Sequence, residues 1–154
     1  MKVRIIELTP QQIVEHWETV CEVVRLSAVP TVYDSPETVG NILEALIDGR
    51  LSCWGMIDRD DRPEKIEDTH IQGFILTTIA HDQIANIRNL LIYGVWSRHF
   101  LDEEAWASIY VSLRRYGKDK TCHSIIGYSK IPRVINLVEK MQGDASERLI
   151  QLAI

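Results

Sequence analysis

The stretch from Leu90 to Trp96, LLIYGVW, constrains the fold more than any other part of the sequence. It is the longest apolar run in the chain, and it is far shorter than the ~20 residues that a membrane-spanning helix needs. Its length is that of a β-strand. Because a strand that is apolar along both faces is buried on both faces, we expect residues 86–96 to form a central strand of a sheet.

The segment that follows this strand indicates a βαβ unit. Asp102 is a helix-capping residue, and apolar residues recur after it at helical spacing, which predicts a helix over 102–117. A short apolar stretch then predicts a buried strand over 124–130. Because crossovers of this kind join parallel strands with a right-handed connection, we expect strand 124–130 to lie beside strand 86–96 and parallel to it.

Two further helices begin with a capping residue followed by proline. Thr9 and Ser35 hold these positions and predict helices over 10–27 and 36–48. The other expected elements are strands over 2–8, 51–58, 70–80 and 147–154 and a helix from Pro132 to about Gly143. The sequence therefore predicts one α/β (α+β) domain over residues 1–154, with a mixed central sheet of about six strands, four flanking helices and the order β-α-α-β-β-β-α-β-α-β.

Charge and cysteine content argue against several functional classes. The 154 residues carry a net charge of −5, whereas nucleic-acid binding needs a basic face and anionic membranes attract basic segments. The three cysteines are an odd number without a CxxC pair, and the first residues do not resemble a signal peptide, so we expect a reduced, cytoplasmic protein. No HxxxH or CxxC spacing indicates a metal site.

The order of elements resembles that of the GNAT superfamily of N-acetyltransferases. The sequence also resembles this superfamily in the segment LLIYGVW, which is followed by a helix, and in the later segments CHSIIGYSK and IPRVINLVEKMQG. The resemblance covers essentially the whole chain. It implies that strand 86–96 leads into a pyrophosphate-binding loop and that helix 102–117 follows this loop. These segments are also similar to those of divergent GNAT-like proteins of bacteriophages, several of which have lost catalysis.

Three departures from the family pattern stand out. The family binds acetyl-CoA through a glycine-rich Q/R-x-x-G-x-G/A loop, but the matching segment here, SRHFLDEEAW, has no glycine and places three carboxylates at the helix start. Val138 stands where many family enzymes have a tyrosine general acid, and Ile131 stands where an asparagine is usual. The chain also ends after one C-terminal strand, whereas the family generally has two. We therefore expect acetyl-CoA to bind very weakly or not at all.

If an acyl-CoA is bound, the resemblance places four residues along the cofactor cleft: Tyr93, Gly94, Trp96 and Arg98. Gly94 marks either the strand bulge that exposes amides to the cofactor in the family, or room for a neighbouring helix. Trp96, at the end of the central strand, is the strongest pocket candidate among the tryptophans. The sequence identifies no general base.

A loop between the first two helices is the candidate contact surface for a partner or substrate. In the family this loop borders the acceptor cleft, and its apolar residues here are Val29, Pro30, Val32 and Tyr33. The alternative is that they fold onto the chain's own core. Cys122 and His123 are adjacent and so point to opposite faces of a strand, which favours a packed thiol and a surface histidine over a catalytic pair.

Two functional hypotheses follow. The first is a GNAT-fold protein without acetyltransferase activity and without a cofactor, which acts as a binding or assembly module, for instance as a bacteriophage accessory or virion-associated protein. It implies a protein partner or a homo-oligomer, in the host cytoplasm or the virion. The alternative is a divergent acyl-CoA-dependent N-acetyltransferase with acetyl-CoA as its cofactor.

Overall fold

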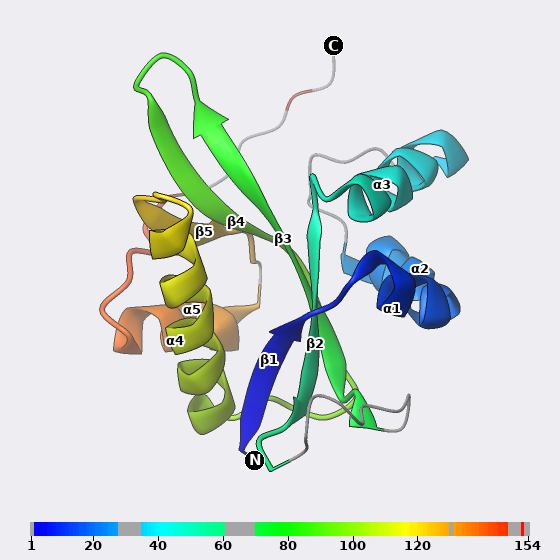
Figure 1. Cartoon of the computed structure of the whole chain (residues 1–154). Helices are drawn as coiled ribbons and strands as arrows, with labels where there is room; N and C mark the ends of the chain where they lie inside the picture. The colour runs from blue at the N-terminus through cyan, green and yellow to red at the C-terminus, as the bar shows by residue number, and fades with distance from the viewer. Residues whose placement is uncertain (1, 28–34, 61–69, 130, 148–151, 153–154) are drawn as a thin grey trace.

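The computed structural model describes residues 2–27, 35–60, 70–129, 131–147 and 152. Within them the strands are β1 (Val3–Glu7), β2 (Ser52–Asp58), β3 (Gly73–Asp82), β4 (Ile87–Ser97) and β5 (Ser124–Gly127). The helices are α1 (Pro10–Glu15), α2 (Trp17–Ser27), α3 (Pro36–Asp48), α4 (Glu103–Asp119) and α5 (Pro132–Lys140). Helices α1, α2 and α3 cover one face of the sheet, and α4 and α5 lie on the other (Figure 1).

The five described strands form one sheet in the order β1-β2-β3-β4-β5. Strands β1 to β4 pair antiparallel with their neighbours, and β5 pairs parallel with β4. The predicted parallel pair is therefore confirmed. Strand β4 has a neighbour on both sides, but β3 is the middle strand of the five, and the β5 pairing reaches only part of β4.

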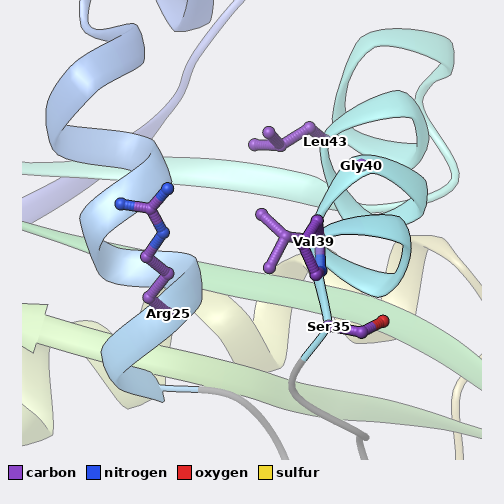
Figure 2. Close-up of a pocket in the computed structure, with 6 residues that line it drawn as sticks. Arg25, Ser35, Val39, Gly40 and Leu43 are labelled. Carbon is purple, nitrogen blue, oxygen red and sulfur yellow. The ribbon is translucent and has the colours of Figure 1, made fainter.

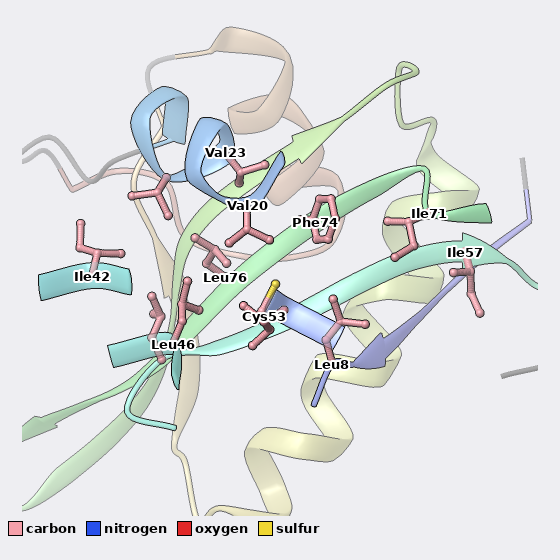
Figure 3. Packing of buried hydrophobic residues seen from close by; sticks show 13 residues of the cluster. Leu8, Val20, Val23, Ile42, Leu46, Cys53, Ile57, Ile71, Phe74 and Leu76 are labelled. Atoms are coloured by element: carbon pink, nitrogen blue, oxygen red, sulfur yellow. The ribbon is translucent and has the colours of Figure 1, made fainter. Parts of the chain in front are cut away.

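Each face of the sheet carries its own apolar cluster. On the α1–α3 side, Val20, Val23 and Phe74 belong to a cluster that helices and strands build together (Figure 3). On the α4 side, Ile109 and Leu113 of the helix pack against sheet residues. Alternation of side chains along each strand supplies both clusters from the same strands, so the sheet is the middle of three layers.

The helix predicted over residues 10–27 is wrong in one respect, because it is divided into α1 and α2 at His16. The His16 backbone, at φ −103° and ψ 19°, leaves the helical region, while its N–H still reaches the Gln12 carbonyl at 3.1 Å. The His16 ring meets the Phe74 ring edge-on, with 6.0 Å between centroids. The division lets α1 pack on α3 while α2 packs on β4, and it gives five described helices instead of four.

Several predicted helix caps are confirmed, whereas α4 continues to Asp119, past the predicted residue 117, and α5 ends at Lys140, before the predicted Gly143. Thr9 and Gln12 form the capping box, and the Ser35 hydroxyl accepts from the Thr38 N–H at 3.1 Å. Gly49 ends α3 in the left-handed region at φ 82°. Strand β5 is shorter than the predicted 124–130, and most of the predicted strand 147–154 lies outside the described residues.

Within the described part of the chain, no helix is both long and apolar enough to cross a membrane. The three cysteines are free thiols. The same residues contain no group of three or more His, Cys, Asp or Glu side chains that could hold a metal ion.

Candidate functional site

A β-bulge interrupts β4 at Tyr93. On one side of it Leu76 of β3 pairs with Gly94, and on the other Thr77 pairs with Ile92, so one step along β3 corresponds to two along β4. Tyr93 is the residue without a partner in this register. Of the two alternatives for Gly94, the strand bulge is the one that this register supports.

The bulge changes which face of the sheet each β4 side chain joins. Before it, Ile92 packs in the cluster under α4, and after it Val95 does so. Tyr93 and Trp96 pack instead against the cluster under α1–α3. The separation of three residues between Ile92 and Val95, in place of two, follows from the extra residue. Partial burial raises the pKa of the Tyr93 phenol.

Beyond the bulge, β4 has an open edge. The register with β5 ends at Ile92 and Gly127, whereas β4 continues to Ser97. On the β5 side, no described strand therefore pairs with residues 93–97. We call these residues the open β4 edge. An unpaired strand edge presents backbone N–H and C=O groups that an extended molecule can bind.

Contacts with β3 fix the end of the open β4 edge. The Arg98 N–H donates to the Gln72 carbonyl at 2.8 Å. Gly73 lies so close to β4 that a Cβ there would stand 2.4 Å from the Trp96 carbonyl oxygen. The absence of a side chain at Gly73 is thus a geometric requirement of this strand end.

Two side chains of the loop from Ser97 to Asp102 hydrogen-bond to nearby backbone groups. The Ser97 hydroxyl donates to the His99 carbonyl at 2.6 Å, and the Asp102 carboxylate accepts from the Ala105 N–H at 2.8 Å. Because the amides of Arg98 and Ala105 already have acceptors, they are not available to a phosphate. A cradle of backbone amides at the start of α4 would therefore have to form without these two amides.

Side chains of α5 meet those at the start of α4. The Arg133 guanidinium carbon lies 3.3 Å from the centroid of the Phe100 ring, a cation–π contact. Lys140 forms an ion pair with Glu103. No ion pair joins Arg133 to an acidic residue within the described chain, so one cationic group remains beside the glycine-free loop before α4.

The structure places the predicted site residues as follows. Tyr93, Gly94 and Trp96 lie along β4, and Arg98 directly after it with an exposed side chain. The Trp96 ring packs on Phe74, with 6.3 Å between centroids. The four predicted contact residues Val29, Pro30, Val32 and Tyr33 lie outside the described residues.

The residues considered as catalytic groups in the sequence take part in packing and backbone hydrogen bonds. Val138 lies half-buried on α5, and its carbonyl accepts from the Gly143 N–H at 2.8 Å. Cys122 packs beside the cluster under α4, and the exposed His123 donates its backbone N–H to the Arg88 carbonyl at 2.7 Å. Within the described residues, no hydrogen bond joins the Cys122 thiol to the His123 ring.

Sequence reasoning missed the contacts between α4 and α5, because they join residues far apart in the chain. It also missed His16, where the helix divides. The available signals were Arg133 and Lys140 on one predicted helix and Phe100 before another. These residues alone do not specify which side chains contact each other.

Solved acetyltransferase structures superpose on the whole chain. AAC(6')-Iy in complex with the bisubstrate analog CoA-S-monomethyl-acetylneamine has a TM-score of 0.67 and 14% identity, with 100% of this chain and 99% of that chain covered. A ribosomal-protein-alanine N-acetyltransferase from Brucella melitensis biovar Abortus 2308 has a TM-score of 0.62 and 12% identity, with 99% of each chain covered. The chain therefore has the GNAT fold.

A third solved structure with this fold is the aminoglycoside acetyltransferase HMB0005 from an uncultured soil metagenomic sample. Its TM-score is 0.65 and its identity 16%, over 100% of this chain and 98% of that chain. No protein-family model and no curated protein sequence matches the chain. The likeness thus establishes the GNAT fold and leaves activity to be argued from the site.

Proposed function

We propose that this GNAT-fold chain is an acyl-CoA-dependent N-acyltransferase whose open β4 edge holds the pantetheine arm of acetyl-CoA. The observation that carries the proposal is the bulge at Tyr93 followed by strand residues that lack a partner on the β5 side. The pantetheine arm is extended and contains two amides. Such a molecule can add to a strand edge through main-chain hydrogen bonds. The structural neighbours, two of which are named as CoA complexes or CoA-analog complexes, support this choice.

The phosphates of the cofactor have to be held by side chains. Arg98 is exposed at the end of β4, and Arg133 lies over Phe100 beside the start of α4. A hydrogen bond to a charged group contributes ~1.5–3 kcal/mol, so these arginines can replace part of what an amide cradle supplies. The carboxylates of Glu103 and Glu104 oppose the phosphates. We therefore expect weaker cofactor binding than the amide cradle of the family would give.

Turnover is expected to be slow. Val138 cannot protonate the departing thiolate, and a positioned general acid contributes ~10²–10⁴-fold to such reactions. Acyl transfer in this chain would depend on placing the thioester and the amine side by side, with the proton delivered by water. Positioning of this kind is what the fixed end of β4 provides.

A second candidate function is a non-catalytic binding or assembly module, as the sequence first indicated, including an accessory or virion-associated role in a bacteriophage. Two observations favour it: the α4 start is capped by its own Asp102, and Val138 replaces the general acid. In that case a protein partner or a second copy of the chain would cover the outer edge of β5.

The experiment that separates these candidates measures release of the CoA thiol and binding of two ligands, acetyl-CoA and S-acetylpantetheine. The proposal expects both ligands to bind, and expects the double variant Arg98→Ala/Arg133→Ala to weaken acetyl-CoA about tenfold or more while leaving S-acetylpantetheine unchanged. Arg115→Ala, an exposed arginine on α4, is the matched control. Equal loss of both ligands in the double variant would contradict side-chain phosphate binding. Absence of binding by both ligands to the unaltered chain would favour the non-catalytic module.

A further inference from the structure

A groove lies between α2 and α3, on the sheet face that also carries Tyr93 and Trp96. Its volume is about 320 Å³, and the described residues that line it are Arg25, Ser35, Pro36, Val39, Gly40 and Leu43. Figure 2 shows Arg25 on α2, and Val39 and Leu43 on α3 across the groove from α2. Because Val39, Leu43, Tyr93 and Trp96 pack against one cluster, the groove belongs to the same side of the molecule as the bulged part of β4.

Gly40 leaves space in this groove. It lies inside α3, where a glycine costs about 1 kcal/mol relative to alanine. A Cβ at this position would meet no atom within 4 Å, so no described neighbour requires the glycine. The missing side chain leaves open space beside Val39 and Leu43.

Arg25 gives the groove its charge. It is the one charged residue among the described residues that line the groove. The ion pair of Arg25 with Glu22 spans 4.0 Å between side chains that are 63% and 58% exposed. A pair so long and so exposed is weak and competes little with a ligand. The groove therefore suits an anionic group joined to an apolar body.

We infer that this groove binds the acyl acceptor, and that the acceptor is a primary amine that also carries a carboxylate and a branched apolar group, as an apolar amino acid does. The carboxylate lies against Arg25, and the apolar group against Val39, Gly40 and Leu43. This inference rests on the proposed acyltransferase function. The same charge arrangement disfavours a polycationic amine.

The test compares two amines of equal size, L-leucine and L-leucinamide, with the polycation spermidine. Their binding to the full chain is followed by ligand-observed NMR, with acetyl-CoA present and absent. Two variants probe the groove. Arg25→Gln removes the charge, and Gly40→Leu fills the open space while improving the intrinsic helix propensity of α3, so it should stay folded. Arg115→Gln, on α4 across the sheet, is the matched control.

The inference expects L-leucine to bind about tenfold or more tightly than L-leucinamide, spermidine to bind more weakly than both, and either groove variant to remove the preference for leucine. Equal binding of the acid and the amide, binding of leucine that survives both variants, no binding of leucine, or preference for spermidine would overturn it. Acetyl-CoA binding is measured in the same samples. Leucine bound in the groove without any acetyl-CoA binding would support the site and refute the proposed function, whereas acetyl-CoA binding without leucine binding would refute the site alone.

Discussion

The substitution Gly73→Ala tests whether the close approach of β3 to β4 fixes the end of the open β4 edge. The added Cβ would lie 2.4 Å from the Trp96 carbonyl oxygen, 2.9 Å from the Ser97 Cα and 3.0 Å from the Met56 sulfur. The first two atoms are backbone and cannot rotate away. The strands must therefore separate by roughly 1 Å, and overpacking of this kind costs about 1–3 kcal/mol.

Separation of the strands also weakens the hydrogen bond from the Arg98 N–H to the Gln72 carbonyl, which adds about 0.5–1.5 kcal/mol. We expect Gly73→Ala to lower the free energy of unfolding by about 2–4 kcal/mol in a urea titration, and to weaken acetyl-CoA binding as Trp96 and Ser97 move. Gly40→Ala is the matched control, because the same methyl group enters open space and should raise the free energy of unfolding by up to about 1 kcal/mol. If Gly73→Ala unfolds within about 0.5 kcal/mol of the unaltered chain, the steric reasoning is wrong.

Two further predictions concern the core. The Trp54 indole N–H donates to the Thr77 hydroxyl at 2.8 Å in a buried position, so Thr77→Val should lower the free energy of unfolding by about 1–3 kcal/mol, and the double change Trp54→Phe/Thr77→Val should cost less than the sum of the single changes. Additive costs in that cycle would show that the two groups are not coupled. Burial raises the pKa of the Cys53 thiol from 9.0 to about 12. Because the folded state favours the protonated thiol, the stabilisation is complete below pH 9 and is lost as the pH rises toward 12, so the stability advantage over Cys53→Ala should shrink above pH 9. A difference independent of pH between 7 and 10.5, roughly one to two units on either side of the thiol's ordinary pKa, would contradict the assignment.

Local features of the sequence predicted local structure well. The caps at Thr9, Ser35 and Asp102 depend on residues within one helical turn, and all three are present. The apolar stripe after Asp102 predicted α4, and the crossover rule then predicted the parallel partner of β4. These signals need no knowledge of distant contacts.

Features that depend on pairing between distant segments were less accessible. Gly94 indicated a bulge, but only the register between β3 and β4 identifies Tyr93 as the extra residue. The burial of β4 was overestimated, since only Leu90 and Gly94 of its 11 residues are buried and the strand begins with the exposed Ile87 and Arg88. The groove beside Gly40 was not foreseen, since a glycine inside a helix gives no sign of what lies next to it.

The pairing of α4 with α5 illustrates the same limit for the candidate site. The sequence showed that the loop before α4 lacks glycine and starts its helix with carboxylates. It did not show that Arg133 lies over Phe100 or that Lys140 binds Glu103. These contacts place cations beside the loop, and they are the reason to expect weak cofactor binding in place of none.

A calorimetric titration of the unaltered chain with acetyl-CoA, at neutral pH and moderate salt, tests the central claim most directly. The open β4 edge and the arginine side chains predict saturable binding at one site, with a dissociation constant of about 0.1–1 mM, which corresponds to roughly −5.5 to −4 kcal/mol. A dissociation constant in the low micromolar range would show that the loop before α4 holds the phosphates far better than its occupied amides allow. No binding at several millimolar acetyl-CoA would contradict the acyltransferase account.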